Sequence, residues 1–164
     1  MKIKLLFILF IINIFNLMNC SKEIKTKGQF KNYILKDLSG NYIDLYKKFK
    51  NKKKLIIINI FSTWNKSCNL EIPKFVKLQK KYIDKIIIIG ISFDNDLNNQ
   101  EIKKVLNKKK LNYPIVMGTK ELAMHIKLRY IPRTFILTDN FKIIRDFTGG
   151  HPDGQFEKIL KKYF

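Results

Sequence analysis

Cysteine is scarce in this sequence: among 164 residues only Cys20 and Cys68 occur. Two cysteines exclude the multi-disulfide framework that holds many small secreted domains together. They form no C-x-x-C pair, and His125 and His151 are too far apart in sequence and context to suggest ligands, so no metal site is indicated. We expect both histidines at the surface or partly buried, and we expect no metal or other cofactor.

Acidic residues are also few: 13 Asp and Glu against 33 Lys and Arg give a formal net charge of +20. The lysines are spread along the chain, in runs such as 52–54 and 108–110 that fall at segment ends, and no nucleic-acid recognition module is present. This distribution indicates solvated lysines and no nucleic-acid partner. Attraction of the positive charge to an anionic membrane surface stays open as an alternative.

Internal repeats and low-complexity segments are missing as well. The hydrophobic content of 46% suits one ordinary globular domain that buries its core without cross-links. We therefore predict a single domain over residues 28–164 and expect it to be a monomer.

The N-terminal segment has the composition of a secretory leader. Lys2 and Lys4 precede an almost wholly apolar stretch that ends at Met18, which is short for a permanent membrane-spanning helix. This pattern predicts a signal peptide over residues 1–19. The domain would then lie outside the cytoplasm, in the bacterial cell envelope.

The end of this leader, Leu17-Met18-Asn19-Cys20, resembles a bacterial lipobox, although Asn19 replaces the usual small residue. It predicts lipid attachment at Cys20, followed by a polar, lysine-rich tether through Lys27. Two alternatives remain: Cys20 is incidental beside an ordinary cleavage site, or the leader stays uncleaved as a short anchor. Each of them also leaves the domain outside the cytoplasm.

Two uninterrupted apolar runs predict strands that are buried on both faces, at 55–61 and 86–91. Strands are also expected at 30–35, 42–45 and 142–147, with a turn at Ser39-Gly40-Asn41 between the first two and a hairpin turn at Asp139-Asn140 before the last. Helices are expected at 45–49, from an Asn65 cap to Tyr82, at 98–109, at 120–128 and at 155–163. Pro73 should kink the second helix or limit its first turns.

The stretch from Leu55 to Pro73 reads LIIINIFSTWNKSCNLEIP. It resembles the strand-turn-helix of thioredoxin-like proteins of the TlpA/ResA type, roughly N-F-W-A-T-W-C-x-x-C-x-x-E-x-P. The matching positions hold Asn59, Thr63, Trp64, Cys68, Glu71 and Pro73, but Asn65 stands where the family has its first cysteine. Residues 35–45 and 130–137 resemble the family's N-terminal hairpin and its cis-proline segment.

The resemblance covers about residues 28–164 and implies an α/β, thioredoxin-like fold. Such a fold has a central mixed β-sheet flanked by helices, here with an N-terminal β-hairpin extension. The implied class is that of extracytoplasmic, membrane-anchored thiol-disulfide oxidoreductases, which act on the thiols or disulfides of partner proteins, for example in cytochrome c maturation.

The substitution at Asn65 changes what such a site could do. Thiol-disulfide exchange needs a thiolate at a helix N-terminus. Asparagine is among the best N-cap residues, so Asn65 keeps the helix while it removes the attacking thiol. Cys68 remains as the candidate sole redox thiol, and it could form only a mixed disulfide or sulfenic acid that another molecule resolves.

Three other interpretations of Cys68 stay open. It could be a buried small hydrophobic residue with a high pKa. It could be the peroxidatic cysteine of a single-cysteine, peroxiredoxin-like peroxidase, although that pattern wants proline at Phe61 and threonine at Asn65. Finally, the protein could be a non-catalytic module that binds a partner at the cis-proline groove.

The remaining site candidates surround this turn. Trp64 could shield the turn or serve as an apolar plug. Glu71 could raise the pKa of the thiol and transfer protons, or interact with the helix dipole.

The cis-proline segment supplies the other candidates. The resemblance implies that Ile131 and Pro132 form, with Trp64, a groove for an extended partner strand, provided that Pro132 is cis. Arg133 could lower the pKa of Cys68, favour an acidic partner or have a plain surface role. Asp94, at the end of the second buried strand, would lie at the edge of the sheet where sites gather.

Overall fold

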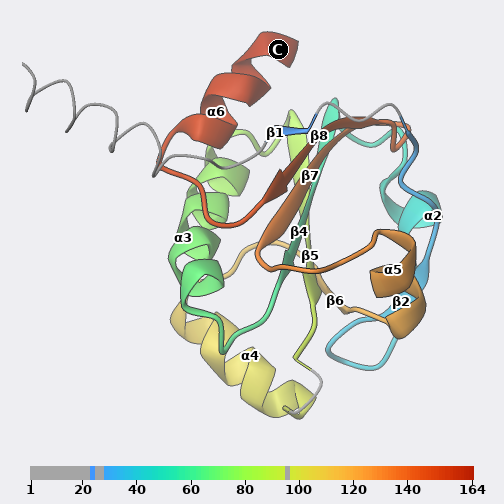
Figure 1. Ribbon diagram of the computed structural model, residues 1–164, viewed down its shortest axis with the longest axis vertical. Coiled ribbons are helices and arrows are strands. Elements are labelled where there is room, and N and C mark those ends of the chain that lie inside the picture. The colour runs from blue at the N-terminus through green and yellow to red at the C-terminus, as the bar shows by residue number, and fades with distance from the viewer. Residues whose placement is uncertain (1–22, 25–27, 95–96) are drawn as a thin grey trace, which may run out of the picture.

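The computed structural model describes residues 23–24, 28–94 and 97–164. The predicted signal peptide and Cys20 lie outside these residues. A six-stranded mixed sheet runs through the middle of the molecule (Figure 1). Its strands, in spatial order, are β1 (Glu23–Ile24), β8 (Ile143–Thr148), β7 (Arg133–Thr138), β4 (Leu55–Phe61), β5 (Ile86–Ser92) and β6 (Ile115–Met117).

Strands β4, β5 and β6 are parallel, whereas β7, β8 and β1 continue the sheet in antiparallel pairs. A separate hairpin of β2 (Ile34–Lys36) and β3 (Tyr42–Asp44) is the predicted N-terminal extension. The predicted mixed sheet and hairpin are therefore confirmed.

Helices cover both faces of the sheet (Figure 1). One face carries α3 (Lys66–Lys81), α4 (Asn99–Lys108) and α6 (Gln155–Leu160), which is followed by a 3-10 turn, η1 (Lys161–Tyr163); the other carries α2 (Leu45–Phe49), α5 (Lys120–His125) and the hairpin. Each layer has its own apolar core against the sheet. The two cores explain why the central strands carry apolar residues on both sides.

Strand β4 is the centre of the sheet, and all seven of its residues are buried. Burial of one isoleucine side chain stabilises the fold by about 1.5–3 kcal/mol relative to its exposure. The single polar residue of the strand, Asn59, pairs with Gly90 of β5 and Thr134 of β7. The apolar run therefore explains the central position of β4 in the sheet. Asn59 is the exception, because its buried side-chain amide needs polar partners.

Two expectations for the N-terminal region are wrong. Residues 30–33 are not a strand, because Phe30 and Tyr33 both pack into the core and the Phe30 amide binds the carbonyl of Phe141 instead of the hairpin (2.9 Å). Part of the expected tether is β1, which pairs with Asp146 and Phe147 of β8.

The helices differ from expectation at their ends. Helix α5 stops at His125 instead of residue 128, because Lys127 adopts a left-handed backbone (φ 52°). The closing helix changes to 3-10 geometry at Lys161. Helix α3 continues past Pro73 to Lys81, so proline does not limit it to its first turns, and the carbonyl of Asn69, which Pro73 cannot pair, accepts Lys109 Nζ (3.4 Å).

Candidate functional site

The turn between β4 and α3 is closed by Asn65. The side-chain Oδ1 of Asn65 accepts the amide of Cys68 (3.0 Å), and its backbone amide donates to the carbonyl of Ser62 (3.2 Å). The predicted N-cap role is confirmed. The start of α3 thus has a helix cap without a thiol at position 65.

Asp94 holds this turn against the end of β5. Its buried carboxylate accepts the Thr63 amide (2.8 and 3.0 Å), the Thr63 hydroxyl (2.9 Å) and the Ser92 hydroxyl (2.6 Å). A carboxylate with this many donors is well satisfied although it is buried. Asp94, which the sequence placed only at the sheet edge, thus fixes the backbone just before Trp64 and Asn65.

Cys68 lies in the first turn of α3 and is only 1% exposed. Burial raises the pKa of its thiol to about 11, and the carboxylates of Glu71 and Asp94 add to the shift. The helix N-terminus therefore does not produce an acidified thiol here. This geometry gives no support to a peroxidase, which depends on a thiolate.

Glu71 is also buried, with 1% exposure, and lies one turn after Cys68. Its Oε1 accepts a hydrogen bond from the backbone amide of His151 (3.2 Å) and lies 3.7 Å from His151 Nδ1. Its Oε2 accepts a hydrogen bond from the side-chain amide of Asn59 (3.4 Å). The carboxylate thus points into the protein, towards the sheet, instead of serving only as a charge at the helix end.

His151 was expected at the surface or partly buried, and this expectation is wrong: it is fully buried, with 3% exposure. Its ring packs against Phe147 and Phe156, with centroids 4.9 and 5.4 Å away, and its Nδ1 lies 2.7 Å from the carbonyl of Gly149. His125, in contrast, is exposed at the end of α5, where its Nδ1 lies 2.5 Å from the Tyr33 hydroxyl.

Sequence reasoning missed the polar residues that surround Glu71. Besides His151, these are Thr134 and Tyr113. The Thr134 hydroxyl accepts a second hydrogen bond from the side-chain amide of Asn59 (3.2 Å). Burial raises the pKa of Tyr113, and the Glu71 carboxylate adds to the shift. Within the described part of the chain, the Tyr113 hydroxyl, Asn59 Oδ1 and His151 Nε2 have no hydrogen-bond partner. Asn59, as the only polar residue in an apolar run, was the one available clue.

The peptide bond between Ile131 and Pro132 is cis. The Pro132 carbonyl accepts the amide of Gly149 (2.8 Å), and a side chain at Gly150 would lie 3.7 Å from Cβ of Ser67, at the start of α3. The cis-proline segment is thus linked to the Cys68 turn through residues 149–150. The cis-proline segment and the start of α3 therefore lie close to each other, as the resemblance implied.

Large apolar side chains are exposed at the turn before α3 and at the cis-proline segment. Trp64 is 67% exposed, so it is not an apolar plug, and Tyr130 is exposed next to the half-buried Ile131. Exposed aromatic side chains such as these are typical of surfaces that bind other proteins.

Arg133 does not act on Cys68 in the expected way. Its guanidinium forms a bidentate pair with the buried carboxylate of Asp146, from Nε to Oδ1 (2.9 Å) and from Nη2 to Oδ2 (2.6 Å), and stacks on the Phe135 ring. The pKa of Cys68 is raised, not lowered. Because the Arg133 side chain is 16% exposed, a plain surface role is also wrong.

Comparison with known proteins agrees with this architecture. The model of the Redoxin family matches residues 25–162. The chain is 30% identical over 145 residues to the thiol-disulfide oxidoreductase ResA of Bacillus cereus, covering 87% of this chain and 82% of the relative. It is also 30% identical over 128 residues to the thioredoxin-like protein YneN of Bacillus subtilis, covering 77% and 73%.

Among solved structures, the thioredoxin domain of a thiol-disulfide oxidoreductase from Bacteroides vulgatus superimposes with a TM-score of 0.71 at 19% identity, covering 86% of this chain and 99% of that one. This similarity confirms the predicted thioredoxin-like fold. With the match to the family model and the two relatives, it leads to one conclusion: the chain belongs to the Redoxin family, as a thioredoxin-like protein of the TlpA/ResA type.

Proposed function

We propose that this protein is a thiol-disulfide oxidoreductase of the cell envelope that works with a single thiol, Cys68. The observation that carries the proposal is the place of Cys68, in the first turn of α3 behind the Asn65 cap. The start of this helix lies beside residues 149–150, which are hydrogen-bonded to the cis-proline segment. The names of the relatives support the class. In this proposal Asn65 takes the place of the attacking cysteine of a two-cysteine site.

The proposed reaction is one exchange step. The Cys68 thiolate attacks one sulfur of a partner's disulfide; a bond forms between Cys68 and that sulfur, the partner's S–S bond breaks, and the released sulfur takes up the proton that Cys68 lost. No external oxidant or reductant is needed. Because Asn65 has no thiol, a thiol of another molecule must break the mixed disulfide.

The proposed partner is a protein whose extended segment lies along Trp64, Ile131 and Pro132. A cis-proline exposes backbone groups that can pair with such a segment by β-augmentation. Arg133 directly follows Pro132, and its ion pair with Asp146 would hold this end of the groove in place without contacting the thiol. Approach of a disulfide, from the partner or from a small molecule, requires a local opening of the folded protein at Cys68, since the thiol is buried.

The location is part of the proposal. We place the domain outside the cytoplasm, behind a signal peptide over residues 1–19 and a lipid on Cys20. Over the part of the chain that the structure describes, no helix has the length and apolar character needed to cross a bilayer.

A second candidate function is a binding module that uses the same groove without thiol chemistry. The burial of Cys68 and its pKa of about 11 favour this candidate. The two functions differ in one respect: exchange requires that Cys68 react in the folded protein, whereas binding does not.

The test is adduct formation with glutathione disulfide, followed by intact mass. We would use full-length protein with Cys20→Ser, so that Cys68 is the only thiol. The exchange function predicts one glutathione adduct, slow at pH 7 and rising about tenfold for each pH unit below the pKa. The Cys68→Ala control should form none. An adduct that appears only after unfolding in urea would remove the exchange function and leave the binding module.

A further inference from the structure

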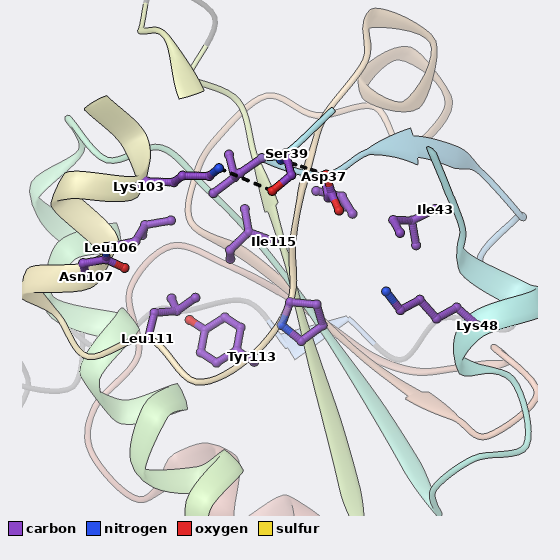
Figure 2. Close-up of a pocket in the computed structure, with 13 residues that line it drawn as sticks. Asp37, Ser39, Ile43, Lys48, Lys103, Leu106, Asn107, Leu111, Tyr113 and Ile115 are labelled. Atoms are coloured by element: carbon purple, nitrogen blue, oxygen red, sulfur yellow. Dashed lines mark hydrogen bonds between the residues drawn. The ribbon is translucent and has the colours of Figure 1, made fainter. Parts of the chain in front are cut away.

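A pocket lies beside the edge strand β6, away from the Cys68 turn (Figure 2). Its floor is formed by residues 113–116, one wall by α4, and the opposite wall by the hairpin with Lys48 of α2. None of its lining residues belongs to the turn at 62–65 or to the cis-proline segment. Its volume is about 260 Å³.

Most of the lining is apolar. Leu106 and Leu111 contribute from the side of α4, Leu38 and Ile43 from the hairpin, and Ile115 from the floor. A dry cavity of about 150 Å³ is enough to hold benzene. This pocket therefore has room for an aromatic ring or a branched alkyl group together with a few further atoms.

Two ammonium groups flank this apolar lining. Lys103 and Lys48 enter from opposite sides, and in Figure 2 their Nζ atoms are the inner ends of both side chains. Lys103 Nζ has one hydrogen bond, to Ser39 Oγ (3.3 Å), although an ammonium carries three donors. Among the described residues, neither lysine forms an ion pair with a carboxylate.

The one acidic side chain in the lining is already engaged. Asp37 accepts the backbone amides of Ser39 (2.8 Å) and Asn41 (2.9 Å) and the side-chain amide of Asn41 (3.1 Å). Its carboxylate thus holds its own turn. The pocket keeps a net positive charge, two ammonium groups against one carboxylate, that a ligand could match.

We infer that this pocket binds a small carboxylate with an aryl or branched-alkyl body. The body lies on Leu106 and Ile115, and the carboxylate accepts hydrogen bonds from Lys103 and Lys48. A neutral apolar ligand would offer no acceptor to either ammonium group, and a polyanion would leave the apolar lining unused. The strongly positive protein as a whole also attracts small anions.

The test is titration of the full-length protein with 3-phenylpropionate, observed through its isoleucine methyl groups by NMR, with a protein-free blank. Saturable shifts are expected for Ile43 and Ile115, which line the pocket, and not for Ile159 of α6, which lies outside the pocket lining. Acetate has the charge without the body, and 3-phenylpropanamide has the body without the charge. Both should bind at least about tenfold more weakly.

A matched pair of variants on α4 separates a built site from general attraction. Lys103→Met keeps the apolar stem and should weaken 3-phenylpropionate binding about tenfold. Lys104→Met removes the same charge from an exposed neighbour outside the pocket and should leave the affinity unchanged. If Lys103→Met does not fold, Lys48→Met tests the same prediction.

Three results would overturn the inference: no saturable binding up to about 10 mM, equal binding of acid and amide, or equal losses in the Lys103 and Lys104 variants. None of them touches the thiol. The inference and the exchange function at Cys68 therefore stand or fail separately.

Discussion

The reactivity of Cys68 is decided by two opposing effects at one residue. A cysteine in the first turn of a helix is normally acidified, because free amides and the helix dipole favour the thiolate. Here burial and the nearby carboxylates of Glu71 and Asp94 outweigh that effect and raise the pKa to about 11. At pH 7 only about one molecule in ten thousand would carry the thiolate.

Neutralising Glu71 should make Cys68 more acidic. In Glu71→Gln, the charge that raises the pKa of Cys68 is gone while its burial remains, so the pKa should fall but stay above its usual value. We expect alkylation by iodoacetamide at pH 8 to be about three- to tenfold faster, measured over pH 6–10 with Cys20→Ser in the background. Glu101→Gln, an exposed acid on α4, is the control. An unchanged pH profile would show that Glu71 does not act on the thiol.

The individual residues differ in how far sequence could place them. Asn65 was predictable as a cap because its partner, the amide of Cys68, is three residues away. The contact between Glu71 and His151 spans 80 residues and depends on how α6 returns to α3, so no local pattern contains it. Local physics therefore predicted the turn, while the buried polar cluster behind it required the fold.

At the scale of elements, the start of α3 carries one cysteine, Cys68, with an asparagine three residues before it. Residues three apart in a helical turn have their Cα atoms about 5 Å apart, inside the range of about 4.4–6.8 Å that a disulfide spans. Asn65 and Cys68 have this spacing. A cysteine at position 65 would therefore have the spacing from Cys68 that a disulfide requires.

Restoring the missing cysteine should restore a redox pair. In Asn65→Cys with Cys20→Ser, incubation with glutathione disulfide should yield an internal disulfide between positions 65 and 68 and two molecules of glutathione. Loss of the asparagine cap costs about 1 kcal/mol of stability, which the crosslink offsets. Thiol counting and intact mass would measure the bond, and Asn69→Cys, on another side of the helix from Cys68, is the control. A stable mixed disulfide with glutathione in place of the internal bond would contradict the prediction.

Helices and strands could be predicted from the sequence where the pattern of apolar residues is unambiguous. Strands β4 and β5 are long apolar runs and were placed to within a residue. The segment from Phe30 to Tyr33 alternates like a strand, but its two rings are drawn into the core and Phe30 makes its backbone contact with Phe141, more than 100 residues away. Long-range packing overrides local alternation there.

At the scale of the whole molecule, the C-terminal helix secures the rear of the site. Phe156 of α6 contacts both Phe75 of α3 and His151, with ring centroids 5.0 and 5.4 Å away. Glu157 in the same helix accepts Lys81 Nζ (2.8 Å) and the Tyr82 hydroxyl (2.7 Å) at the end of α3. Docking of α6 therefore holds His151 against Glu71.

The contribution of Glu157 to this docking should depend on pH. Hydrogen bonds from Lys81 and Tyr82 lower the pKa of Glu157 from 4.5 to about 2 in the folded protein. A lowered folded-state pKa stabilises the fold above the unfolded value, so this stabilisation is complete above about pH 5 and is lost as the pH falls from 4.5 to 2. Glu157→Gln should thus lower the free energy of unfolding in urea at pH 7 but hardly at pH 2. Asp84→Asn, whose carboxylate is 95% exposed and 4.0 Å from Lys53, should change little at either pH. An equal loss for Glu157→Gln at both pH values would mean that Glu157 stabilises α6 through packing and not through its charge.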